Sequence, residues 1–228
     1  MKHLSTYNVT DNEWIFYNSK LCSVACSLGH AIQSRELEGR INELCQSFFN
    51  QWQFVIDSYN KLYKLLNILN NYSDKHMEGR NISEYVLKSI ESEDEFKNYS
   101  YILIVSIKTY LDLFVCLVDI IQNPMNTNER MTDFNKFWKK DGSIIRKVFE
   151  EFQRLSNTEK NWVDEIIEIR NKIIHRGFHL KPLFGFNKSE ELTIQACKGA
   201  DKRNIEIGML FNGFMSCMPI VEERISNF

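Results

Sequence analysis

The chain has 228 residues, of which 43% are hydrophobic and 13% aromatic, so it can bury the core of one well-sized domain. Three prolines and nine glycines leave room for long uninterrupted helices. The formal net charge of −2 argues against strong nonspecific binding to nucleic acid, although it permits a local basic patch.

The N-terminal residues 1–14 are polar and lack the apolar core of a signal peptide, so they give no indication of export. The six cysteines lie among apolar residues without the paired spacing of a zinc finger, and we interpret them as reduced thiols in a reducing compartment. Cys22 and Cys26 are one helical turn apart and could in principle hold a metal, but no second Cys or His pair lies at a recognisable distance. The sequence therefore predicts a cytoplasmic protein without metal or cofactor.

The first strong periodic pattern runs from Leu37 to Leu69. Its apolar residues recur three or four positions apart, which predicts an amphipathic helix of roughly 50 Å at about 1.5 Å per residue. The turn-prone residues 70–74 are expected to end this helix, and a polar connection with a short helical piece over 84–92 is expected to follow. We interpret residues 1–34 as an N-terminal extension and residues 35–228 as the bundle itself.

The second predicted helix spans about residues 99–122 and stops before Asn123-Pro124. It is apolar almost all round, and a membrane span is the rival interpretation because about 20 apolar residues can cross a bilayer. Lys108, Asp112 and Asp119 argue against a membrane, since each would cost roughly 3 kcal/mol at the bilayer centre. We therefore expect a helix buried on two sides, in a bundle core and at a homodimer interface.

A third helical region is expected over about residues 132–154, with an interruption at Asp141-Gly142. A fourth helix follows, and a capping signal is present at each of its ends. Ser156 and Glu159 have the spacing of a capping box, and Gly177 lies where a C-terminal cap glycine belongs.

The segment over residues 178–196, which follows Gly177, is short and contains Gly and Pro. We expect it to hold a small hairpin around residues 187–189. The last helix covers about residues 207–225, with a kink at Pro219. The predicted fold class is therefore all-α, a single domain built as a bundle of four to five helices with a small β-hairpin or irregular insert before the last helix.

The fourth helix carries the chemically distinctive residues. At 100° per residue, Trp162, Val163 and the isoleucines of this helix fall within one arc of about 160°, and Arg170 falls near the middle of that arc. Asn171 lies at its edge and His175 just beyond, on the same side. A permanently charged guanidinium among isoleucines is costly unless it is paired or faces a wet cleft.

Two interpretations of Arg170 are open. In the structural one, Arg170 pairs with a carboxylate or with carbonyls of a neighbouring helix, and His175 is a helix-end cation favoured by the dipole. Asp112 of the second predicted helix is the candidate carboxylate partner, in a supporting role behind the residues that would contact a ligand. We expect Asp112 to contact Arg170 or Lys108 rather than solvent, because buried charges need partners.

In the functional interpretation, this stretch binds phosphate. From Arg170 to Lys181 the chain carries four fixed positive charges, two histidines and no acid. A metal site formed by the two histidines is the weaker idea, because Gly177 is expected to break the helix between them. The candidate phosphate-binding residues around the arginine are Lys172, Arg176, His179 and Lys181.

The segment Arg170-Asn171-Lys172-Ile173-Ile174-His175 resembles the Arg-x4-6-His motif of the HEPN superfamily (higher eukaryotes and prokaryotes nucleotide-binding domains). In many members a polar residue follows the arginine, and Asn171 satisfies that pattern. The similarity in motif placement and helix order covers roughly residues 34–228. It implies a bundle of four or five helices that dimerises, so that two copies of the motif form one cleft.

The resemblance further implies a metal-independent endoribonuclease, in which an activated 2′-hydroxyl attacks the adjacent phosphate and leaves a 2′,3′-cyclic phosphate. His175 would then transfer protons, Arg170 would stabilise charge on the pentavalent phosphate, and Asn171 would orient the histidine or hold a phosphate oxygen.

Such an enzyme would be a toxin or antiphage-defence effector that acts on RNA, with an antitoxin protein as a candidate partner and no role for a membrane. The alternative is a catalytically inactive HEPN-like module that binds nucleotide, RNA or a protein. A plain helical dimer, in which Arg170 is only a structural ion pair, is a third interpretation.

Overall fold

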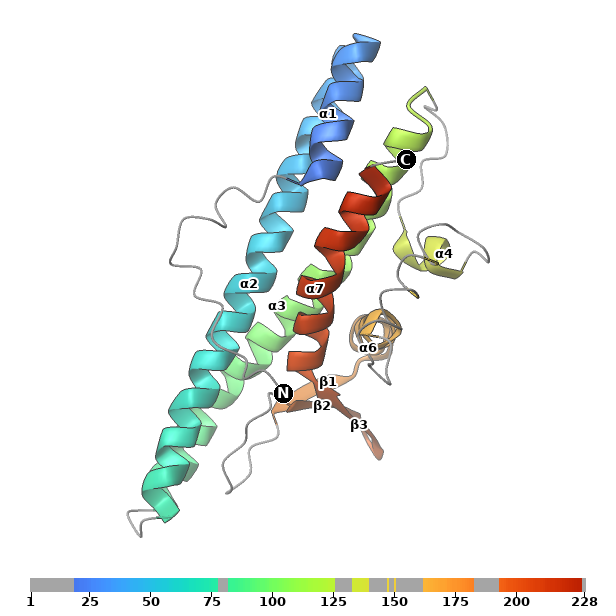
Figure 1. Ribbon diagram of the computed structural model, residues 1–228. Helices are drawn as coiled ribbons and strands as arrows, with labels where there is room; N and C mark the ends of the chain where they lie inside the picture. The colour runs from blue at the N-terminus through green and yellow to red at the C-terminus, as the bar shows by residue number, and fades with distance from the viewer. Residues whose placement is uncertain are drawn as a thin grey trace. The chain divides into compact units, whose positions relative to one another are not determined.

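The computed structural model describes residues 19–77, 82–125, 133–139, 147, 150, 162–182 and 193–226. Its helices are α1 (Lys20–Ile32), α2 (Arg35–Met77), α3 (Ile82–Gln122), α4 (Phe134–Lys139), α6 (Trp162–Arg176) and α7 (Ile207–Ser226). The strands β1 (His179–Pro182), β2 (Thr193–Lys198) and β3 (Asp201–Glu206) form an antiparallel sheet in the order β1-β2-β3 (Figure 1). The predicted all-α fold with a small β insert before the last helix is confirmed.

The first two predicted helices are longer than expected. α2 continues through residues 70–74 to Met77, and α3 begins at Ile82, so the expected polar connection belongs largely to a helix. The prediction that Asn, Ser and Asp end α2 was wrong because each disfavours a helix by only about 0.5 kcal/mol. Extending an existing helix is far easier than starting one, and the chain absorbs this small cost.

The outcome for the other predicted elements is mixed. α4 falls within the expected third helical region, Pro219 lies inside α7, and the β2–β3 hairpin around Gly199 (φ 59°) was not predicted. The interruption at Asp141-Gly142, the capping box at 156–159 and the hairpin at 187–189 lie outside the described residues.

The chain divides into two compact units, which are described separately. Among the described residues, the first unit contains 54–106 and 163–212, which include α6 after its first residue, the sheet and the start of α7. The second contains 19–53, 107–162 and 213–226, which include α1, α4 and most of α7.

An aromatic cluster forms the core of the second unit. The rings of Phe48 and Tyr110 stack with centroids 3.9 Å apart, and Phe214 of α7 meets Tyr110 edge-on at 4.9 Å. Trp162, the first residue of α6, packs edge-on against Phe214 at 6.3 Å. Such ring pairs contribute about 0.5–1.5 kcal/mol each beyond the area that they bury, so they fix the start of α6 firmly.

A buried hydrogen-bond network joins α1, α3 and α7 within the same unit. The carboxylate of Glu222, which is 2% exposed, accepts one hydrogen bond from the Tyr110 hydroxyl and one of 2.6 Å from Ser19 Oγ. Ser19 also caps α1, because its hydroxyl accepts a hydrogen bond from the backbone N–H of Cys22. Residues 20–32, which the sequence placed in an extension, therefore form a helix anchored to a buried carboxylate.

α3 is the one helix in the described part of the chain that is long and apolar enough to cross a membrane. Its apolar window is 61% buried inside the protein, the pattern that a core helix of a soluble protein shows. Lys108 of this helix is 3% exposed and lies 2.5 Å from Asp112, which also accepts a 2.8 Å hydrogen bond from the backbone N–H of Phe134. The predicted contact between Asp112 and Lys108 is confirmed.

The apolar surface of α3 that suggested a dimer interface is mostly covered within one chain. Ten of its large apolar side chains between residues 103 and 120 are buried. The large apolar residues of α3 that are exposed, among those whose side chains the structure describes, are Val86, Leu87, Ile90, Tyr101 and Ile102. The homodimer therefore stays a prediction, and the excess of apolar residues no longer supports it.

The indole of Trp162 packs directly against Gly213 of α7, where no side chain blocks it. A Cβ atom at this position would lie 2.4 Å from Cγ of the Trp162 ring, closer than any real contact, and a ring cannot bend aside. We expect Gly213→Ala to lower the free energy of unfolding by about 1–3 kcal/mol, measured by urea denaturation.

Gly208→Ala in the same helix is the matched control, since a Cβ there meets nothing within 4 Å. It should be neutral, or stabilising by up to about 1 kcal/mol, because alanine loses less backbone entropy in a helix. Equal effects of the two substitutions would contradict the contact.

Candidate functional site

The site is built on the last turns of α6, where the helix ends sharply at Gly177. This glycine has a φ of 66°, and the N–H of Phe178 donates a 3.2 Å hydrogen bond back to the carbonyl of Lys172. That bond between residues six apart is the mark of a Schellman motif, so the predicted glycine cap is confirmed. The cap leaves His175 and Arg176 exposed in the last turn.

The three residues predicted to be catalytic lie together. Nη1 of Arg170 is 2.8 Å from Nε2 of His175 and donates a 3.3 Å hydrogen bond to Oδ1 of Asn171. A guanidinium can only donate hydrogen bonds, so Nε2 must be the acceptor. This hydrogen bond requires the tautomer of His175 that carries its proton on Nδ1.

The structural interpretation of Arg170 required a carboxylate or the carbonyls of a neighbouring helix as its partner. Among the residues that the structure describes, the guanidinium of Arg170 forms no ion pair, and its hydrogen bonds go to Asn171 and His175. Asp112 has its own partners in the second unit, as described above, and its supporting role beside Arg170 stays a prediction.

Arg170 lies on the apolar face of α6, at the point where the burial of that face decreases. The first half of the helix is buried at Val163, Ile166 and Ile169, but Ile174 is 42% exposed and Arg170 itself is only half-buried. Helical periodicity shows which residues share a face, but it does not show where along the helix the covering elements stop. Arg170 therefore lies at the open end of the apolar stripe, within reach of solvent.

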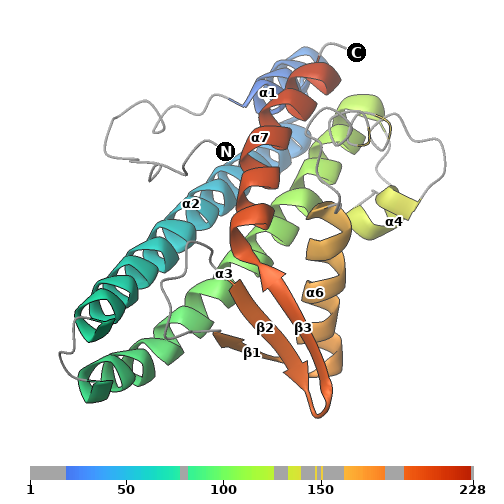
Figure 2. The same ribbon diagram turned by 60° about the horizontal axis from the view of Figure 1, so that its bottom comes forward.

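Arg203 of β3 binds two of the three carboxylates of α6, those of Glu165 and Glu168. Its guanidinium contacts Glu165 through two nitrogens, one of them Nε at 3.2 Å, and it contacts Glu168 through Nη1. Partial burial disfavours the charged form of Glu168, but hydrogen bonds from Arg203 and Lys172 outweigh it and hold the pKa of this carboxyl below its ordinary value. Figure 2 shows the sheet lying beside α6, as these pairs require.

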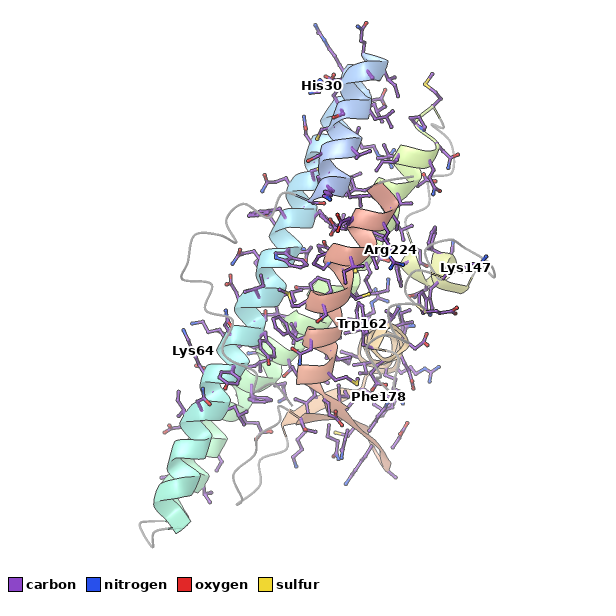
Figure 3. All side chains as sticks on the ribbon, viewed as in Figure 1. His30, Lys64, Lys147, Trp162, Phe178 and Arg224 are labelled. Carbon is purple, nitrogen blue, oxygen red and sulfur yellow. The ribbon has the colours of Figure 1, made fainter. Side chains whose placement is uncertain are left out.

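Lys172 is the least available of the four predicted phosphate-binding residues. Its side chain is 13% exposed, its Nζ lies 3.2 Å from Glu168, and it sits 5.3 Å from the centroid of the Phe178 ring. Phe178, labelled in Figure 3, follows the end of α6. Lys172 thus stabilises the helix end instead of presenting its charge to solvent.

The other three predicted residues are exposed. Arg176 ends α6, and its carbonyl accepts a 2.6 Å hydrogen bond from Nζ of Lys198. His179 and Lys181 alternate with the buried Leu180 on β1, so they share the open face of the sheet.

Sequence reasoning missed two cations that the sheet adds to this surface. Cys197 of β2 is paired with His179 on one side and with Lys202 of β3 on the other, so Lys202 and His179 lie on the same face of the sheet. The second cation is Lys198, the last residue of β2 before the hairpin turn. The segment Gly199-Ala200-Asp201 was the available turn signal. Within the described ranges no acid forms an ion pair with Arg176, Lys181 or Lys202.

The described residues contain no group of three or more His, Cys, Asp or Glu side chains arranged to hold a metal ion. Comparisons with protein-family models, with curated proteins and with solved structures found no match to this chain. The resemblance to the HEPN superfamily therefore rests on the segment from Arg170 to His175 and on the order of the helices, and it stays a prediction.

The Arg203 network provides a test of how the sheet is held on α6. Arg203→Ala leaves the buried carboxylate of Glu165 without its partner, and we expect a loss of about 1–3 kcal/mol in the free energy of unfolding at neutral pH. Lys202→Ala, next in sequence but on the open face, should change it by less than about 0.5 kcal/mol. Similar losses for both variants, measured by urea denaturation, would refute the network.

Proposed function

We propose that this chain is a metal-independent endoribonuclease of the HEPN type, with Arg170, Asn171 and His175 as its catalytic residues. The observation that carries the proposal is the 2.8 Å contact between Nη1 of Arg170 and Nε2 of His175, at an exposed helix end. A fixed cation whose hydrogen bonds go only to neutral groups is suited to receive an anion. A phosphodiester is such an anion.

The proposed reaction begins with phosphate binding. A nonbridging oxygen of the phosphodiester is a stronger acceptor for the guanidinium than a neutral imidazole, so it draws Arg170 away from His175. The lone pair of Nε2 is then free to take the proton of the 2′-hydroxyl as a general base. The 2′-oxygen attacks phosphorus, the bond to the 5′-oxygen breaks, and a 2′,3′-cyclic phosphate forms.

Arg170 and Asn171 have separate roles in this mechanism. Once released from His175, Arg170 would stabilise the negative charge that grows on the pentavalent phosphorus. The side-chain oxygen of Asn171 accepts from Arg170, which makes it an orienting group for the guanidinium more than for the imidazole. The leaving 5′-oxygen takes its proton from the imidazolium or from water.

RNA binding would extend over the exposed cations around this helix end. Arg176 continues α6, while His179, Lys181 and Lys202 lie on the open face of the sheet in the same unit. This local patch offsets the net charge of −2 of the whole chain. The free cysteines among the described residues support a reducing, cytoplasmic setting.

The biological setting that we propose is a toxin or an antiphage-defence effector, which an antitoxin protein would hold inactive. The second candidate is a catalytically silent HEPN-like module that binds nucleotide, RNA or protein. One observation favours this alternative: in the unbound chain the lone pair of Nε2 is already occupied by Arg170. If no ligand displaces the guanidinium, His175 cannot act as a base.

Substitution of the two central residues tests the enzyme proposal. With mixed cellular RNA in EDTA, we expect the wild-type chain to cleave and His175→Ala and Arg170→Ala each to lose about 10²–10⁴-fold in rate. His30→Ala is the matched control, because His30 is likewise an exposed histidine in the last turn of a helix, α1, and it should cleave like wild type.

The melting temperatures of the same proteins separate the two interpretations of Arg170. On the enzyme proposal all four proteins melt alike. No cleavage by the wild type, together with destabilisation by Arg170→Ala alone, would show that Arg170 is structural.

We also propose a homodimer, on the family resemblance, in which two copies of the motif share one cleft. Sedimentation at micromolar concentration should then give about twice the 27.0 kDa mass of the chain. A monomer that still cleaves RNA would remove the shared cleft from the proposal but leave the chemistry of Arg170 and His175 in place, since both belong to one chain.

A further inference from the structure

Three of the six cysteines lie where α1 packs against the first part of α2. Cys22 and Cys26 are one turn apart on α1, Cys45 is on α2, and all three are half-exposed and free. Figures 1 and 2 both show these helix segments side by side. The catalytic proposal uses none of the three thiols.

α1 and α2 form a tight antiparallel hairpin about Gln33, which has a left-handed φ of 56°. Nδ1 of His30, labelled in Figure 3, lies 3.1 Å from Oε1 of Glu38, so these residues face each other across the turn. A Cβ on Gly29 would lie 3.1 Å from Cδ1 of Ile41, which shows that the two backbones approach closely there.

The geometry of this hairpin puts Cys22 and Cys45 opposite each other. Cys22 precedes Gln33 by 11 residues (33 − 22), and Cys45 follows Ser34 by 11 (45 − 34), so both lie about 16 Å from the turn at about 1.5 Å per residue. Cys26 is only 7 residues from Gln33, about 10 Å from the turn.

The same pair also shares the contact faces of the two helices. Cys22 is 7 residues before Gly29 and Cys45 is 7 after Glu38, and 7 residues return a helix to within about 20° of the same direction. Helices packed about 8–10 Å apart bring facing Cα atoms within the range of about 4.4–6.8 Å that a disulfide spans. Cys26, three residues before Gly29, is turned about 60° away.

The electrostatics of the thiols agree with this placement. A hydrogen bond from the Cys45 thiol lowers the pKa of Cys22, and the same bond, together with burial, raises the pKa of Cys45. Cys26 also interacts with the Cys45 thiol, but its effect on the pKa of Cys45 is smaller than that of Cys22. Cys22 is therefore the thiol that more readily becomes a nucleophilic thiolate, while Cys45 stays protonated beside it.

We propose that Cys22 and Cys45 are a peroxide-sensitive pair that closes into a disulfide between α1 and α2. The Cys22 thiolate attacks a hydroperoxide, takes up one oxygen as sulfenic acid and releases water or an alcohol. The sulfur of Cys45 then attacks the sulfenic sulfur, and a second water leaves as the S–S bond forms. Two thiols are oxidised and one peroxide is reduced, and a dithiol reductant reverses the step.

Peptide mapping of the full chain after treatment with hydrogen peroxide tests this proposal. After alkylation of the remaining thiols, we expect the count of free thiols to fall from six to four and one intramolecular link to join the peptides of Cys22 and Cys45. Dithiothreitol should restore all six. Because the readout is a covalent link, it is independent of whether the chain cleaves RNA.

Three variants make the test specific. Cys45→Ser and Cys22→Ser should each lose the link, with circular dichroism confirming that both fold. Cys197→Ser, at the half-exposed cysteine of β2, should keep it. Six unreacted thiols, a dominant link through Cys26, or a link only between two chains would each overturn the proposal.

Discussion

Arg203 pairs with Glu165 and Glu168, two of the three acids of α6, and this network decides which charges remain near the end of that helix. Glu165 is buried and would be costly without a cation, and Glu168 lies one turn before Lys172. Because Arg203 and Lys172 satisfy these acids, neither is paired with Arg170 in the described part of the chain. The same contacts hold β3 on α6, so the network that fixes the sheet also leaves the helix end cationic.

The properties of two side chains then limit what this helix end can do. A guanidinium has only hydrogen-bond donors, so Nε2 of His175 must accept the hydrogen bond from Arg170. Without a ligand, the cation of Arg170 is therefore hydrogen-bonded to the lone pair that a general base would use. In the proposed mechanism, an arriving phosphate would offer a better acceptor and would separate the two groups. The event that binds the anion would also free the base, which couples substrate binding to catalysis without a moving segment.

Local sequence signals predicted which side chains lie together at this helix end. The spacing of Arg170, Asn171 and His175 and the cap at Gly177 are properties of one helix, and periodicity and turn chemistry describe one helix reliably. Arg203 could not be found in this way, because its partner Glu165 lies 38 residues earlier and the pairing depends on how the sheet docks.

Two further differences have physical causes of the same kind. α2 passes through residues 70–74 because single-residue propensities are small compared with the cooperativity of a long helix. Cys45 comes near Cys22 only after α1 folds back on α2, and residues 20–32 show no strong helical pattern that would have suggested this turn.

The central claim is that this site cleaves RNA through its 2′-hydroxyl. The most direct measurement is chemical identification of the product ends after purified protein acts on RNA in EDTA, beside single-stranded DNA of matched sequence. The account predicts 5′-hydroxyl and 2′,3′-cyclic phosphate ends from the RNA and intact DNA, since DNA lacks the attacking group. Cleavage of both nucleic acids, or RNA products with 5′-phosphate ends, would contradict it.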